Sequence, residues 1–250
     1  MLHHSPLGRD LGYARSYDPD LLYPIKRSLG RDAIGVPRPL PFTGDDVWTA
    51  YELSWLDCRG KPGVAVAELR IAADSDYLIE SKSLKLYLNS LSATRFTDVA
   101  AVHRLIERDL SGAAARPVQV RLYLPEHDTE PLAAAPLQGT CIDGLTVKIE
   151  TYHVDPDTLC ATGHVVDETL YSHLFRSNCP VTGQPDWASV MVHYRGPRMS
   201  HSGLLRYLVS YREHAALHEQ CVERIFMDIL AHCRPNALSV YARFTRRGGL

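Results

Sequence analysis

Hydrophobic and polar positions along the chain predict the same series of elements twice. In the first half, two runs of apolar and β-branched residues, 47–56 and 64–71, flank a Gly-Lys-Pro-Gly turn and predict paired strands. Apolar residues then recur at helical spacing from Leu84 to Leu91, and a second predicted helix covers 98–111. Further strands are predicted near 118–124 and 145–152.

The second half repeats this order with little letter-by-letter identity. A strand-like run at 190–194 is followed by a helix with an apolar stripe at 204–209, by a second helix whose stripe runs from Val222 to Cys233, and by a strand at 238–242. Paired strands followed by paired helices predict an α+β fold, with antiparallel sheets and the helices on one face.

Composition shifts along the chain indicate three regions. Residues 1–45 are rich in Pro, Gly, Arg and Asp with weak periodicity, which predicts an irregular lead-in. We expect the first structural unit over 46–155 and the second over 156–250, with the boundary at the Asp-Pro-Asp sequence that starts at 155.

The overall composition is that of a globular chain in a reducing compartment. Of 250 residues, 45% are hydrophobic and 22% charged, and the net charge of −2 provides no basic field for nucleic acid or an anionic membrane. The N-terminus lacks the apolar core of a signal peptide. Six scattered cysteines form no C-x-x-C pair, so we expect free thiols and a cytoplasmic location.

The segment 177–187 places a thiol and a carboxylate seven residues apart, at Cys179 and Asp186. Pro180, Gly183 and Pro185 disfavour regular structure here, which predicts a rigid loop. Most free cysteines are buried packing residues, but this one is flanked by polar residues. A thiolate adds readily to an electrophilic carbon, and a nearby carboxylic acid can deliver the accompanying proton.

A carboxylate begins a helix in each half of the chain, at Glu80 and Glu219. Projected backwards, the stripe of the last helix falls on His218 and Glu219, and Glu80 has the same relation to the stripe that contains Leu84. Because a buried carboxylate is costly unless it is paired, these residues are either structural pairs or ligand contacts. A carboxylate can accept bidentately from the adjacent N–H groups of a guanine-like edge.

Two basic segments are candidates for binding a phosphate. Lys82 and Lys85 share the polar face of their predicted helix, near its start, where backbone N–H groups would add to the attraction. Arg246-Arg247-Gly248-Gly249 combines guanidinium groups with glycines that allow close backbone approach. Solvated surface charge is the ordinary alternative for both, and no Rossmann or P-loop glycine motif is present.

A metal site is a further possibility from spacing alone. His214, His218 and Cys221 lie at i, i+4 and i+7, which on one helix would place three zinc-type ligands on one face.

Three segments, 79–87, 177–187 and 218–224, together and in this order resemble the QueF-type nitrile reductases of queuosine biosynthesis. The resemblance implies two tandem tunnelling-fold (T-fold) units and the reduction of 7-cyano-7-deazaguanine to the aminomethyl base by two NADPH, through a thioimide on cysteine and then an imine. It assigns the nucleophile to Cys179 and the proton donor to Asp186. It assigns substrate contacts to Ile79, Glu80, Ser81, His218 and Glu219, and cofactor contacts to Ser81, Lys82, Arg247 and Gly248.

The resemblance implies no metal, no nucleic-acid or membrane partner, a small 7-deazaguanine substrate and a homo-oligomer, a dimer. Two alternatives remain open from the residues themselves: a metal-dependent GTP or pterin cyclohydrolase-like enzyme of the same fold, and a purine-binding protein without catalysis.

Overall fold

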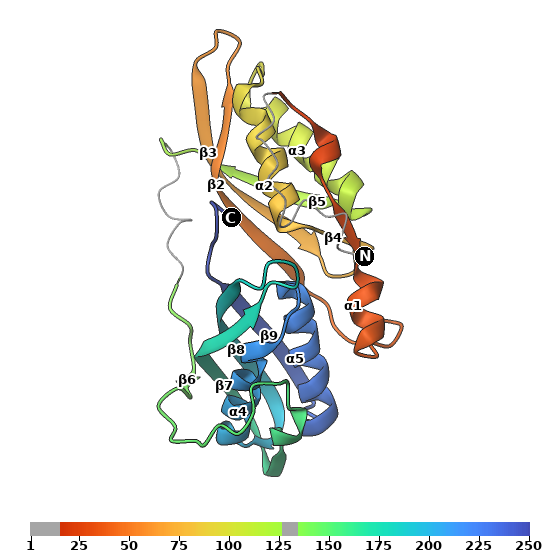
Figure 1. Ribbon diagram of the computed structural model, residues 1–250, viewed down its shortest axis with the longest axis vertical. Helices are drawn as coiled ribbons and strands as arrows, with labels where there is room; N and C mark the ends of the chain where they lie inside the picture. The colour runs from red at the N-terminus through yellow and green to blue at the C-terminus, as the bar shows by residue number, and fades with distance from the viewer. Residues whose placement is uncertain (1–15, 127–134) are drawn as a thin grey trace. The chain divides into compact units, whose positions relative to one another are not determined.

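The computed structural model describes residues 16–126 and 135–250. The described residues divide into two compact units (Figure 1), the first formed by 16–126 together with Arg246–Leu250, and the second by Ala135–Thr245. The predicted boundary near 155 therefore falls inside the second unit, and the first 15 residues of the predicted lead-in lie outside the described residues. The last five residues belong to the first unit although the whole second unit precedes them.

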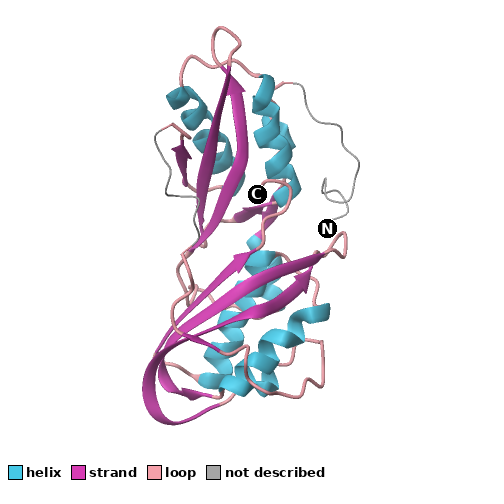
Figure 2. Ribbon diagram, turned by 90° about the vertical axis from the view of Figure 1, so that its left-hand side faces the viewer, coloured by secondary structure: helices cyan, strands magenta, loops and turns pink. Residues whose placement is uncertain are grey.

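Unit 1 contains a three-stranded antiparallel sheet in the order β2-β3-β5, with helices α2 and α3 packed on one face, and a two-stranded antiparallel sheet of β1 and β4 (Figure 2). Its elements are η2 (Pro19–Leu21), β1 (Pro24–Lys26), α1 (Arg27–Ala33), β2 (Asp45–Leu56), β3 (Pro62–Ala72), β4 (Tyr77–Ile79), α2 (Ser81–Ser90), η3 (Leu91–Ala93), α3 (Val99–Ala114) and β5 (Val118–Tyr123).

The core of unit 1 forms because alternate strand residues meet the apolar helix stripes. Ala65, Ala67, Leu69 and Ile71 of β3 alternate inward, as expected for a sheet with one covered face. The predicted stripe of α2 is confirmed, since its members are buried in the same core: Leu84, Tyr87, Leu88 and Leu91.

Unit 2 repeats this plan with a four-stranded sheet in the order β6-β7-β8-β9 and with α4 and α5 on one face (Figure 2). Its elements are β6 (Thr140–Cys141), η4 (Pro156–Thr158), β7 (Ala161–Asn178), β8 (Pro185–Met199), α4 (His201–Ser210), η5 (Tyr211–Glu213), α5 (His218–Cys233) and β9 (Ala237–Phe244). All pairs are antiparallel except the two-residue pairing of β6 with β7. The predicted α+β class is confirmed.

The sequence pattern missed the longest strand and added one that does not exist. β7 spans 18 residues, but register shifts at Thr162/Val165 and Ser172/Phe175 interrupt its alternation, so no period-two signal persists. Residues 145–152, predicted as a strand, are irregular. They run along α4 and the turn after it, where the Lys148 carbonyl accepts from Arg206 and the Tyr152 carbonyl accepts from the Glu213 amide.

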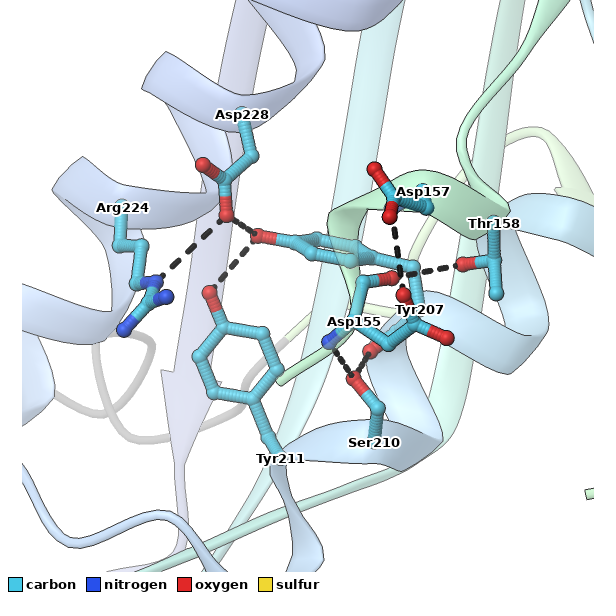
Figure 3. Close-up of polar contacts among 8 residues, drawn as sticks. All are labelled: Asp155, Asp157, Thr158, Tyr207, Ser210, Tyr211, Arg224 and Asp228. Carbon is cyan, nitrogen blue, oxygen red and sulfur yellow. Dashed lines mark hydrogen bonds and ion pairs between the residues drawn. The ribbon is translucent and has the colours of Figure 1, made fainter. Parts of the chain in front are cut away.

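The helix pair of each unit is joined through a tyrosine and an aspartate at matching positions. In unit 2 the Tyr207 hydroxyl donates to Asp228 at 2.6 Å and lies 2.7 Å from the Tyr211 hydroxyl, while Arg224 lies 3.6 Å from the same carboxylate (Figure 3). In unit 1 Tyr87 donates to Asp109 at 2.8 Å. Asp109 and Asp228 are each the eleventh residue of their helices.

An Asp-Pro-Asp turn is fastened to the first helix of each pair in the same way. The Asp155 amide donates to Ser210 Oγ at 3.0 Å, and Ser210 donates to the Tyr207 carbonyl (Figure 3). In unit 1 the Asp18 amide donates to Ser90 Oγ at 3.2 Å. The duplication predicted from pattern therefore extends to individual side chains. No helix in 16–126 or 135–250 is long and apolar enough to cross a membrane.

Candidate active site

The end of the β7–β8 hairpin holds the candidate nucleophile. Cys179 directly follows the last residue of β7, and its amide donates to the Gln184 carbonyl at 2.8 Å while its carbonyl accepts from the Gly183 amide at 3.0 Å. Gly183 has φ +68°, a left-handed conformation that favours glycine. Both backbone polar groups of Cys179 are thus fixed within a six-residue turn, and its side chain is 6% exposed.

Asp186 lies on a strand and not in the loop that the sequence predicted. It is the second residue of β8 and pairs with Ser177, so both side chains lie on the helix-covered face of the sheet. Asn178 pairs with Pro185 one step further on, which brings Cys179 and Asp186 to the same end of the hairpin. The Asp186 residue is 5% exposed.

His218, the first residue of α5, completes this cluster. Its Nε2 lies 3.4 Å from Asp186 Oδ1. Its ring is stacked on Phe244 of β9, with centroids 3.8 Å apart and planes within 4°. Phe244 was not predicted from the sequence, where the one signal was an aromatic residue at the end of a predicted strand. Within unit 2 the fold therefore gathers Cys179, Asp186 and His218 at one edge.

Glu219 is half-buried, and the buried face of α5 differs from the predicted one. The buried residues are Cys221, Ile225, Ile229 and Cys233, whereas Val222 and Phe226 are only half-buried. Projected backwards, this face meets His218 and not Glu219. Within 16–126 and 135–250 the Glu219 carboxylate has no hydrogen bond or ion pair, so it is available to accept from a ligand.

The three-residue metal arrangement that the spacing allowed is not formed. His214 lies in an extended segment before α5 begins, so it does not share a helical face with the other two residues. Cys221 is fully buried beside Ser177, and burial raises the pKa of its thiol to about 12, which keeps it protonated at neutral pH. Among the described residues, no group of three or more His, Cys, Asp or Glu side chains is placed to hold a metal ion.

In unit 1, Glu80 caps helix α2. Its carboxylate accepts from the amides of Lys82 at 2.7 Å and Ser83 at 2.9 Å and from the Ser81 hydroxyl at 3.2 Å, and burial raises its pKa. Those amides are therefore not available to a phosphate, contrary to the expectation for the helix start. Ile79 is buried in the core, so only its backbone could reach a ligand.

Glu80 and Glu219 are not equivalent, although the sequence pattern treated them alike. The counterpart of Glu80 is Ser200, the N-cap of α4, and the counterpart of Glu219 is Ala100 in α3. Glu80 serves a structural role that a serine fills in the other unit.

The two basic segments meet in unit 1. Residues 246–250 turn back onto β2, where the Tyr51 amide donates to the Gly249 carbonyl at 2.9 Å and Leu250 packs against the core. Gly248 and Gly249 have φ of +58° and +89°, and a Cβ on Gly248 would lie 2.8 Å from the Lys85 ammonium. Ser81 is exposed one turn before Lys85 on α2.

The described part of unit 1 has no counterpart of the candidate catalytic groups at the matching edge. Leu56 pairs with Pro62 as Asn178 pairs with Pro185, so Asp57 corresponds to Cys179 and Gly63 to Asp186. A Cβ on Gly63 would lie 2.7 Å from the Trp55 indole, which fills that position. The chain therefore carries one such cluster in its described units.

Comparisons with known proteins show which family the chain resembles. A family described as nitrile reductase, 7-cyano-7-deazaguanine-reductase N-term, matches residues 13–122, and a family described as QueF-like protein matches residues 185–250. A protein of Azoarcus sp. (strain BH72) named NADPH-dependent 7-cyano-7-deazaguanine reductase is 58% identical over 98% of this chain and 88% of its own length. Proteins of the same name from Burkholderia vietnamiensis (strain G4 / LMG 22486) and Desulfotalea psychrophila (strain LSv54 / DSM 12343) are 52% and 51% identical over 99% and 98% of the chain, which is 90% and 89% of their lengths.

The two units, each with paired helices on one face of an antiparallel sheet, are the tandem T-fold arrangement that the resemblance implied. Together, the matched families and relatives show that the chain belongs to the 7-cyano-7-deazaguanine reductase family of nitrile reductases.

Proposed function

We propose that this chain reduces the nitrile of 7-cyano-7-deazaguanine to the aminomethyl group with NADPH, using Cys179 as nucleophile and Asp186 as proton donor. The observation that carries the assignment is the junction of a thiol, a carboxylate and an imidazole at one end of the β7–β8 hairpin.

The first step forms a bond between Cys179 Sγ and the nitrile carbon. The thiol loses its proton, one C–N π bond breaks, and the nitrile nitrogen gains a proton, which gives a neutral thioimide. Asp186 accepts the thiol proton and delivers it to nitrogen, so the addition needs no external acid. His218 lies 3.4 Å from the carboxylate and can stabilise its charged form before the first transfer and after the second.

The guanine-like edge of the substrate is bound by the second unit's helix α5. Glu219, which has no hydrogen-bond or ion-pair partner among the described residues, accepts from the adjacent ring N–H and amino groups, and His218 contributes from the helix start. We also assign substrate contacts to Ile79, Glu80 and Ser81 of unit 1; for Glu80, oxygen lone pairs remain beyond those used by the α2 amides.

We assign the cofactor to Ser81, Lys82, Arg247 and Gly248 of unit 1. The proximity of Gly248 to Lys85, which lies one turn after Ser81 on α2, supports this assignment. NADPH, when bound, supplies the two hydrides that the nitrile consumes. The left-handed Gly248–Gly249 turn leaves no side chain above the backbone, and the basic side chains of Lys82 and Arg247 supply charge for a phosphate. Glu80 already accepts from the first free amides of α2. The phosphate is therefore bound by the basic side chains and by the Ser81 hydroxyl.

Intact-mass spectrometry tests the proposal directly. Added without NADPH, 7-cyano-7-deazaguanine should increase the mass of the native chain by one substrate and leave Cys179→Ala unmodified. Binding to Cys179→Ala should remain measurable, because the ring contacts are untouched. An adduct that persists in Cys179→Ala would overturn the nucleophile, and zinc-dependent activity would favour the cyclohydrolase-like alternative.

We further propose a homodimer acting in the cytoplasm, without nucleic acid or membrane. Trp187 and Tyr241 are 44% and 45% exposed on the sheet face of unit 2 opposite its helices, which supports self-association. The six cysteines are all free, as expected in a reducing compartment. Light scattering of the purified chain measures the oligomeric state.

A further inference from the structure

Asn178 immediately precedes the nucleophile and uses all four of its polar groups. Its amide donates to the His214 carbonyl at 2.8 Å, and its carbonyl accepts from the Ala216 amide at 3.2 Å. These two bonds form an isolated parallel bridge between the end of β7 and the segment 214–216. That segment leads directly into His218, so the bridge links the nucleophile to the start of α5.

The side chain of Asn178 reinforces the same link. Its Nδ2 donates to the Arg212 carbonyl at 3.3 Å, and its Oδ1 accepts from Arg176 Nη2 at 3.1 Å. The side-chain amide thus binds the turn before α5 through its nitrogen and the β7 residue Arg176 through its oxygen.

Unit 1 contains the same backbone bridge without a polar side chain. The Leu56 amide donates to the Thr94 carbonyl at 2.9 Å, and the Leu56 carbonyl accepts from the Phe96 amide at 2.8 Å. The fold therefore tolerates leucine at this position. In unit 2 the asparagine is followed by the proposed nucleophile Cys179. In unit 1 the leucine at the matching position is followed by Asp57.

We infer that Asn178 is a positioning residue, which holds Cys179 in register with His218 through the 212–216 segment. The inference rests on the proposed role of Cys179. The backbone bridge attaches the end of β7 to the segment 214–216, and the two side-chain bonds add two further attachments, to Arg212 and to Arg176. Displacement of a reacting atom by about 1 Å can slow a reaction on the order of 10²-fold.

The test compares Asn178→Leu, the residue that unit 1 uses, with Asn178→Asp, which keeps an acceptor for Arg176 but has no donor for the Arg212 carbonyl. Asn236→Leu is the matched control, since Asn236 is exposed at the opposite end of the unit 2 strands and its side chain has no partner among the described residues. Adduct formation with 7-cyano-7-deazaguanine is followed in single turnover. Affinity is measured with each change combined with Cys179→Ala.

Both Asn178 variants should form the adduct roughly 10–100-fold more slowly, with unchanged affinity and thermal unfolding close to that of the control. Wild-type adduct rates in either variant overturn the inference. Iodoacetamide labelling of Cys179, read by peptide mass, needs no substrate and should be faster in Asn178→Leu, which adds no charge beside the thiol. If the native chain forms no adduct, the proposed function is wrong. If Cys179 is labelled at the native rate in Asn178→Leu, the positioning role is wrong, whatever the outcome for the proposed function.

Discussion

At the residue scale, Asp186 is the position where the two units differ most in chemistry. Its counterpart in unit 1 is Gly63, which is covered by the Trp55 indole. At the matching position unit 2 has the carboxylate of Asp186 beside the imidazole of His218. A carboxyl group that is 5% exposed is costly unless it is paired, and the imidazole of His218 lies 3.4 Å from this one.

Replacement of Asp186 by Asn should slow adduct formation on Cys179 on the order of 10²–10⁴-fold, because the amide cannot carry the proton to nitrogen. Stopped-flow absorbance of the thioimide measures the rate. Asp167→Asn is the control, since Asp167 lies 2.8 Å from His193 in an exposed aspartate–histidine pair of the same hairpin. Equal rates in Asp186→Asn and in the native chain would remove Asp186 from the mechanism.

At the element scale, the tyrosine–aspartate hydrogen bond of each helix pair should stabilise the folded state, and this contribution should be lost at alkaline pH. Burial and the neighbouring Tyr211 and Asp228 raise the pKa of Tyr207 above its ordinary value of 10.0. A group with a raised native pKa stabilises the fold fully below its unfolded pKa and loses that contribution as pH rises towards the native value. Unfolding temperature should therefore fall as pH rises above about 10, and less steeply in Tyr207→Phe. Identical slopes in the two proteins would contradict this.

The matching N-caps of α2 and α4 allow the structural and ligand roles of Glu80 to be separated. Ser200 caps α4 by accepting from the Gly203 amide at 3.1 Å, so Glu80→Ser should retain a cap and cost well under the roughly 0.5–2 kcal/mol of a lost one. If Glu80 also binds substrate, affinity for 7-cyano-7-deazaguanine should fall while thermal unfolding stays close to native. Glu80→Ala, which removes both the cap and the substrate contact, is measured for comparison. If both variants bind 7-cyano-7-deazaguanine with native affinity, Glu80 caps the helix and does not bind substrate.

Elements with uninterrupted periodicity were predictable from sequence, and those shaped by tertiary contacts were not. The stripe of α2 and the strand β3, whose buried residues alternate regularly, follow directly from residue spacing. β7 was hidden by its two register shifts, and the strand expected at 145–152 lies instead as an irregular strap on α4. Cys179 and Asp186 could be named from sequence, but His218 stacking on Phe244 joins residues of two elements that only folding brings together.

At the scale of the whole molecule, the basic segments near residues 82 and 247 belong to one unit although 165 positions separate them. Lys82→Ala and Arg247→Ala should each raise the KM for NADPH about ten- to a hundredfold, since a charge-assisted bond contributes roughly 1.5–3 kcal/mol. NADH kinetics should change much less. Arg104→Ala, an exposed cation of the same unit, serves as control. Equal losses with both cofactors would show that neither side chain recognises the extra phosphate.

The attachment of residues 246–250 to unit 1 has a consequence for synthesis. Leu250 packs against the unit 1 core, and the Tyr51 amide donates to the Gly249 carbonyl. The last strand of that unit ends much earlier in the sequence, at Tyr123. On a ribosome adding roughly 5–20 residues per second, that partner emerges on the order of ten seconds after β5. During this interval the β2 edge is open to other strands. Unit 2 must be translated before unit 1 is finished, so a premature stop within unit 2 leaves both units incomplete.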